Sequence, residues 1–105
     1  MDGLDVMTTT LPAITEREFL RQVAELARLY RWRVYHPWLS IRSDRGWPDV
    51  AMVRPPRLVL AELKTARGKV SPHQAEWLDL LGACPGVEVF LWRPDDIQRI
   101  AEILR

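Results

Sequence analysis

Apolar side chains recur every three or four residues near the start of the chain, the spacing of one buried helix face. These side chains are Phe19, Val23, Leu26, Ala27 and Tyr30. Thr15 can cap the helix N-terminus, and Glu18 stands three residues later, where it completes a capping box. The pattern predicts a helix that begins after Thr15 and reaches about Tyr30, with residues 1–13 as a tail.

Short apolar runs, typical of strands, follow this helix. The runs are residues 32–36, 49–53, 58–64 and 87–92. Residues 37–47 have no clean period and predict a long loop between the first two strands. Pro55-Pro56 predicts a turn between the second and third strands, so the first three strands should pair antiparallel.

A second capped helix and a terminal helix complete the pattern. Ser71, Pro72 and Gln74 suit the N-cap, first and third helical positions of a helix that reaches about Ala83. After Pro94, four apolar residues at helical spacing predict a last helix, namely Ile97, Ile100, Ala101 and Leu104. The order αβββαβα predicts an α/β fold with one mixed sheet over residues 14–105, in which the last two strands are parallel and joined by the second helix.

The composition limits the classes of function. The chain has 105 residues, 15 basic against 14 acidic side chains and a net charge of +1, so one domain without a global basic excess is expected. No apolar run is long enough for a membrane span and the N-terminus lacks the pattern of a secretory signal, which predicts a soluble cytoplasmic protein. The single cysteine, Cys84, is expected to be a small buried hydrophobe.

Charged residues interrupt the third predicted strand. Glu62 and Lys64 are two residues apart and therefore share the face of Leu58 and Leu60. Another carboxylate, Asp49, begins the neighbouring strand. Burying these charges is costly unless they compensate one another, and two adjacent carboxylates favour a hard divalent cation such as Mg²⁺ or Mn²⁺ between them. A purely structural ion cluster is the alternative.

These residues also carry a family resemblance. Gly46-Trp47-Pro48-Asp49, then Glu62-Leu63-Lys64, then Ser71-Pro72-His73-Gln74 resemble the PD-(D/E)XK nucleases and, more narrowly, their VRR-NUC group. The resemblance covers nearly the whole chain and implies a restriction-endonuclease-like αβββαβ core with a C-terminal helix. It also implies metal-dependent hydrolysis of phosphodiester bonds.

The resemblance assigns roles to individual residues. Asp49, Glu62 and the backbone carbonyl of Leu63 would hold Mg²⁺ or Mn²⁺, and Lys64 would position the attacking water and offset charge on the phosphate. Gln74 matches the family glutamine, although it is equally explained as the capping partner of Ser71. Glu16 matches the acidic residue of the first helix, whereas Glu18 is better explained as a cap.

Basic side chains concentrate around this candidate site. Seven basic and three acidic residues lie between Arg42 and Lys69, Arg54 and Arg57 among the basic ones. The loop residues expected to contact the DNA backbone are Arg42, Arg45, Arg67 and Lys69. His36 can contact a phosphate or be a half-buried residue at a strand end. Trp38 and Trp47 are the candidates for stacking on bases, while Trp77 and Trp92 suit the core and His73 the solvent.

The sequence thus predicts a metal-dependent DNA endonuclease of a single domain. By analogy with junction resolvases it acts on branched DNA as a homodimer, in phage or bacterial DNA processing, because resolving a four-way junction takes two symmetric cuts. Two alternatives remain open, a non-catalytic nucleic-acid-binding or assembly module of the same fold and a nuclease acting on RNA.

Overall fold

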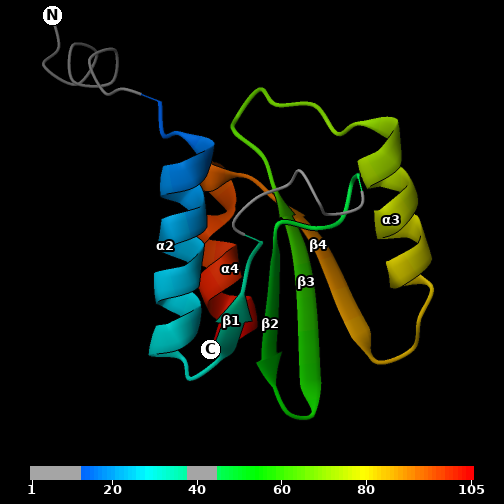
Figure 1. Ribbon diagram of the computed structural model, residues 1–105. Coiled ribbons are helices and arrows are strands. Elements are labelled where there is room, and N and C mark those ends of the chain that lie inside the picture. The colour runs from blue at the N-terminus through cyan, green and yellow to red at the C-terminus, as the bar shows by residue number, and fades with distance from the viewer. Residues whose placement is uncertain (1–12, 38–44) are drawn as a thin grey trace, which may run out of the picture.

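The computed structural model describes residues 13–37 and 45–105 (Figure 1). The elements in these ranges are α2 (Glu16–Leu29), β1 (Arg33–Tyr35), β2 (Val50–Arg54), β3 (Arg57–Leu63), α3 (Pro72–Gly82), β4 (Val87–Trp92), the 3-10 helix η2 (Pro94–Asp96) and α4 (Ile97–Leu104). Every helix and strand expected from the sequence is present, with ends that differ by at most a few residues. No helix in the described part of the chain is long and apolar enough to cross a membrane.

The four strands form one mixed sheet in the order β1-β2-β3-β4. β1 pairs with β2 and β2 with β3 antiparallel, whereas β3 and β4 are parallel. This confirms the predicted pairing. Because α3 connects the parallel strands, its N-terminus returns to the end of the sheet at which β3 finishes (Figure 1).

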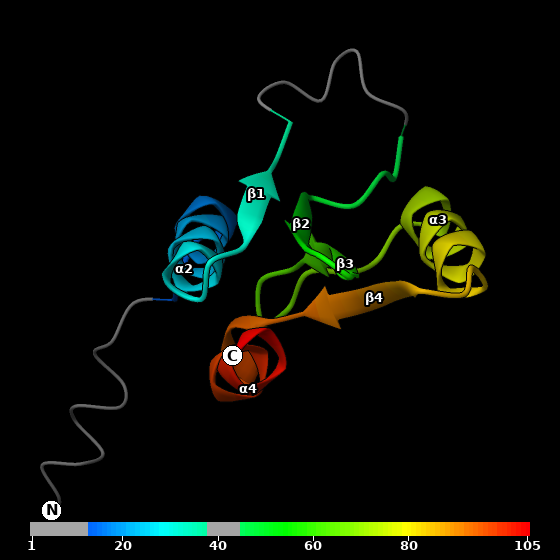
Figure 2. The same ribbon diagram turned by 90° about the horizontal axis from the view of Figure 1, so that it is seen from below.

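One face of the sheet carries the hydrophobic core. α2 and α4 cover this face, and α3 lies on the opposite one (Figure 2). The fully buried core side chains include Phe19 and Val23 from α2, Met52 and Val59 from the sheet, and Ile100 from α4. The stripe predicted for the first helix is thus confirmed as its buried face.

The capping box predicted for the first helix is present. The Glu18 backbone N–H donates to the Thr15 hydroxyl at 3.1 Å, and the Glu18 carboxylate accepts from the Thr15 backbone N–H at 3.3 Å. The hydrogen bonds from Thr15 lower the pKa of the Glu18 carboxyl. Glu18 therefore serves the helix N-terminus, which leaves Glu16 as the acidic candidate on this helix.

α3 is covered much less than the other helices. None of its residues is fully buried, and Leu80 is 60% exposed. Cys84, just beyond its C-terminus, is exposed, so the prediction that Cys84 is buried was wrong. The apolar positions of this segment are half-covered because one helix alone lies on this face of the sheet.

Arg54 and Arg57 do not belong to the basic surface near the candidate site. They lie at the β2–β3 hairpin turn, at the far end of the sheet, and both guanidinium groups pack over the Trp32 ring, with centroid distances of 4.6 and 4.9 Å. Arg54 donates to the carbonyls of Tyr30 and Leu104. Arg57 forms two 2.7 Å bonds with the Glu88 carboxylate. Counting them toward a DNA surface was wrong, because they satisfy helix-end carbonyls and an ion pair.

Candidate functional site

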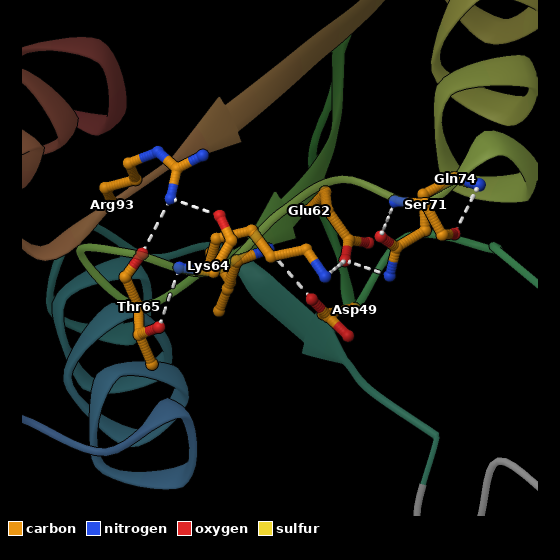
Figure 3. Close-up of polar contacts among 9 residues, drawn as sticks. Asp49, Glu62, Lys64, Thr65, Ser71, Gln74 and Arg93 are labelled. Carbon is orange, nitrogen blue, oxygen red and sulfur yellow. Dashed lines mark hydrogen bonds and ion pairs between the residues drawn. The ribbon is translucent and has the colours of Figure 1, made fainter.

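Glu62 is the buried charged residue at the centre of the candidate site. Its side chain is 1% exposed at the C-terminal end of β3. Its Oε2 accepts a 2.7 Å hydrogen bond from Gln74 Nε2 and lies 3.6 Å from Lys64 Nζ (Figure 3). Its Oε1 is buried without a hydrogen-bond partner. A buried carboxylate oxygen of this kind is costly unless a further group binds there.

Asp49 reaches the same point from the neighbouring strand. Val50 pairs with Ala61 in the antiparallel register, so Asp49 comes level with Glu62. Asp49 Oδ2 accepts a 2.8 Å hydrogen bond from the Leu63 backbone N–H. Since the N–H and C=O of one strand residue point to the same side, the Leu63 carbonyl faces the Asp49 side as well. The predicted convergence of Asp49, Glu62 and Lys64 is therefore present (Figure 3).

The segment before Asp49 is locked against α3. Gly46 has φ +84°, and a Cβ placed there would lie 2.4 Å from the backbone carbon of His73 and 2.7 Å from the backbone nitrogen of Gln74. The Trp47 ring meets Trp77 edge to face at 4.9 Å. These contacts hold Asp49 and the start of α3 in one arrangement. They also place Trp47, one of the two stacking candidates, in contact with a protein ring, and Trp38 lies outside the described residues.

Gln74 both caps α3 and contacts the buried carboxylate of Glu62. Its Oε1 accepts from the Ser71 backbone N–H at 2.9 Å, and its own backbone N–H donates to the Ser71 hydroxyl at 3.2 Å. The amide nitrogen of the same side chain donates to Glu62. The capping box therefore fixes the rotamer of Gln74 and, through it, the orientation of the Glu62 carboxylate (Figure 3).

Glu16 lies beside this cluster, on the side of α2. It lines a hollow of about 220 Å³ together with Arg17, Leu20, Asp49 and Leu63. His36 lines a second, larger hollow along α2. Glu16 is thus brought to the candidate site, whereas His36 is brought to the adjoining surface.

Comparison with known proteins adds information about the fold. No protein-family model matches the chain, and no curated protein matches its sequence. A solved structure described as a "VRR_NUC domain protein" is similar with a TM-score of 0.63 and 18% identity, covering 88% of this chain and 87% of the other. The chain has the VRR_NUC fold. This confirms the fold expected from the three sequence motifs, all of which lie within it.

The VRR_NUC fold of this chain places the Glu62 carboxylate in an unfavourable electrostatic environment. Burial raises the pKa of the Glu62 carboxyl to about 8, the nearby Asp49 carboxylate acts in the same direction, and Lys64 opposes both. The lysine does not fully compensate, because its ammonium is 3.6 Å away and faces only one of the two oxygens. Without a bound cation, Glu62 therefore favours the protonated form at neutral pH.

This shift predicts how the stability of the metal-free protein depends on pH. The pKa of Glu62 is raised on folding from an ordinary value of 4.5 to about 8, so the folded state binds the proton more tightly than the unfolded state. The stabilisation is complete below pH 4.5 and is lost as the pH rises toward 8, by up to about 1.4 kcal/mol of unfolding free energy per pH unit. Urea unfolding in EDTA across this range measures it, with Glu62→Gln as the control that should remove this component.

The residues present fit a hard divalent cation. Two carboxylates, one of which has an unpartnered buried oxygen, and a backbone carbonyl directed to the same side supply oxygen ligands only, which Mg²⁺ and Mn²⁺ prefer. No group of three or more His, Cys, Asp or Glu residues arranged to hold a metal occurs among residues 13–37 and 45–105. Mg²⁺ commonly uses one or two carboxylates and completes its shell with water and substrate phosphate, so a pair is sufficient.

The basic loop residues predicted for DNA contact are exposed where the structure describes them. Arg45 precedes the locked segment, and Arg67 and Lys69 lie in the loop between β3 and α3, which follows Lys64. Arg42 lies outside the described residues. His73, at the start of α3, is exposed as predicted.

Sequence reasoning missed Arg93. Its Nη1 donates to the carbonyls of Thr65 and Gly68, both at 2.7 Å (Figure 3). The turn between these two residues directly follows Lys64, whose backbone N–H bonds to the Trp92 carbonyl at 3.0 Å. Arg93 therefore fixes the chain on either side of the turn that carries Arg67. An arginine after the last strand gave no signal in the sequence, because its partners are carbonyls of a distant loop.

Proposed function

We propose that this protein is a metal-dependent nuclease that hydrolyses phosphodiester bonds in DNA. The observation that carries the proposal is the convergence of Asp49, Glu62 and Lys64, with one buried Glu62 oxygen lacking a partner. The similarity to a VRR_NUC domain protein supports the proposal through the fold.

The residues divide the work between holding the cation and handling the substrate. Asp49, Glu62 and the Leu63 carbonyl would hold Mg²⁺ or Mn²⁺, and Gln74 keeps Glu62 oriented toward it. Such a cation, when bound, lowers the pKa of a water molecule and neutralises charge on the phosphate.

Lys64 is the positively charged side chain beside the two carboxylates. Its side chain is 12% exposed, so its field is weakly screened. Its ammonium can orient the attacking water by donating a hydrogen bond and can stabilise the additional negative charge of the pentavalent phosphate. Glu16, which lines the hollow beside Asp49, would contact water or the leaving group.

The branched-DNA activity of a homodimer is the most specific form of this proposal. The described domain is small, so one copy has little surface with which to grip a long duplex. A four-way junction has two equivalent strands to cut, and a two-fold dimer would present one site to each.

The wild-type protein tests the proposal directly. Purified protein is incubated with linear, flapped and four-way-junction DNA and with RNA of the same sequence, in Mg²⁺, in Mn²⁺ or in EDTA. We expect DNA to be cut in either cation and not in EDTA, because chelation removes the source of activated water. Paired symmetric cuts in the junction would support the dimer.

Other outcomes would contradict specific parts of the proposal. Cutting of RNA alone would assign the site to an RNA nuclease. Binding of DNA without cutting in any cation would favour a non-catalytic module of the same fold.

A further inference from the structure

A second hollow runs along the outer surface of α2. It has a volume of about 520 Å³ and lies between this helix and residues His36 and Pro37. The described residues that line it are Arg17, Leu20, Arg21, Ala24, Glu25, Arg28, His36 and Pro37. We refer to it as the α2 cleft.

The α2 cleft adjoins the candidate active site. Arg17 and Leu20 line both the cleft and the smaller hollow that contains Asp49 and Leu63. A ligand that fills the cleft therefore reaches the carboxylates at one end. This continuity distinguishes the cleft from an unrelated surface depression.

The charge of the cleft is positive, with three arginines against one glutamate in its described lining, although the whole chain is nearly neutral. Arg17, Arg21 and Arg28 lie on one side of α2, because separations of four and seven residues return to the same helix face. Glu25 is the acidic residue among the described lining, and it pairs with Arg21 at 3.3 Å. The Arg21 and Glu25 side chains are 66% and 62% exposed, so this pair is weak and Arg21 can turn to another anion.

We propose that the α2 cleft binds the sugar–phosphate backbone of the nucleic acid and leads it to the site of cleavage. This inference rests on the proposed nuclease function and assigns the substrate path to residues outside the predicted basic loops. Arg17 to Arg28 spans about 16 Å along the helix axis, which matches the rise of about five nucleotides of a duplex strand. Guanidinium groups bind phosphates in pairs of hydrogen bonds, so arginines one and two turns apart on one helix side suit phosphates along a single strand.

The experiment compares two double variants that remove the same charge. The variant Arg21→Ala/Arg28→Ala removes two guanidinium groups from the lining of the cleft. The control variant Arg33→Ala/Arg99→Ala removes two exposed arginines that line neither hollow. Binding of labelled duplex DNA, single-stranded DNA and RNA is measured by fluorescence anisotropy in EDTA across a salt titration. EDTA prevents cleavage, so binding is measured independently of the reaction.

We expect the cleft variant to lose affinity and salt dependence together. Two lost phosphate contacts lower the slope of log K against log salt by about two units and weaken binding of duplex DNA at least about tenfold at moderate salt. The control variant should change both quantities much less. In Mg²⁺, the cleft variant should show a raised KM with kcat retained, since the carboxylates are intact. Glu25→Gln should tighten binding, because it removes the negative charge beside Arg21.

The results separate this inference from the proposed function. Equal slopes and affinities for the two double variants, at unchanged melting temperature, would overturn the cleft as a backbone path even if the wild type cuts DNA. A change in the slope of log K against log salt that is confined to the cleft variant would support the cleft as a backbone path, even if the wild type cuts nothing. A wild type that cuts nothing would contradict the proposed nuclease activity instead. Stronger competition by polyglutamate than by nucleic acid would overturn the inference by identifying an acidic polypeptide as the occupant.

Discussion

Glu62→Gln is expected to abolish metal-dependent cleavage while leaving the metal-free protein at least as stable as the wild type. The substitution keeps a carbonyl oxygen that can accept the hydrogen bond from Gln74, but it removes the charge that would hold the cation. A bound cation lowers the activation barrier by several kcal/mol, so we expect its loss to reduce the cleavage rate about 1000-fold or more. Single-turnover cleavage in Mg²⁺ and urea unfolding in EDTA give the two measurements.

The stability result has the opposite sign from that of an ordinary ion pair. At neutral pH the buried carboxyl of Glu62 favours its proton, with a pKa of about 8, so an amide imitates the state that the folded protein prefers. The unfolded wild type gains free energy by ionising, and the unfolded variant does not. The advantage of Glu62→Gln should therefore grow between about pH 5 and pH 8.

Glu88→Gln is the matched control. Glu88 is also a strand glutamate, but it pairs with Arg57 at 2.7 Å, far from the site, and this pairing lowers its pKa. The pair is about one third exposed, so losing it should cost about 1 kcal/mol or less of unfolding free energy and leave cleavage unchanged. If Glu62→Gln cleaved normally and lowered the stability instead, Glu62 would belong to a structural ion cluster and the nuclease site would be wrong.

Gly46→Ala is expected to lower both the stability and the activity, although Gly46 carries no chemistry. A Cβ at this position would lie 2.4 Å from the carbonyl carbon of His73 and 2.5 Å from its carbonyl oxygen. Both are backbone atoms of α3, which cannot rotate away as a side chain could. The segment before Asp49 or the start of α3 must move, and Gln74 and Asp49 would separate. We expect a loss of roughly 2–4 kcal/mol of unfolding free energy and at least about tenfold in cleavage rate.

Gly86→Ala separates the effect of the backbone angle from that of the contact. Gly86 has the same φ of +84°, but a Cβ there would meet nothing within 4 Å. Gly86→Ala should therefore lower the unfolding free energy only by the penalty for a left-handed conformation, about 1–2 kcal/mol, and leave the cleavage rate unchanged. Thermal unfolding and single-turnover cleavage of both variants provide the comparison. Equal losses in the two variants would show that the contact between Gly46 and α3 has no role in positioning the site.

Much of the fold follows from local patterns. Helix starts were predictable because Thr15 with Glu18 and Ser71 with Gln74 satisfy backbone groups within three residues. Strand pairing was predictable because a two-proline turn and an intervening helix leave one direction for each connection. The alternation of side chains along a strand placed Glu62 and Lys64 on one face and made them stand out from the apolar run.

Other features depend on contacts between distant segments, which no local pattern encodes. Arg54 and Arg57 look like any other basic residues in the sequence, yet the fold places them on the carbonyls that end helices. Arg93 donates hydrogen bonds to the carbonyls of Thr65 and Gly68 only because β4 packs beside β3 and brings it to this turn. Cys84 is exposed because a single helix covers its face of the sheet.

The sequence alone determined which residues are the candidates for the chemistry, because Asp49, Glu62 and Lys64 are charges in positions where strand periodicity demands apolar side chains. Only the tertiary structure decided how these side chains are arranged. It brought Gln74 into contact with Glu62, packed Gly46 against α3 and placed the arginines of α2 along a cleft that shares Arg17 with the hollow beside Asp49. The physical reason is that periodicity reports which side of an element is buried, whereas distances between side chains of different elements are set by how those elements pack.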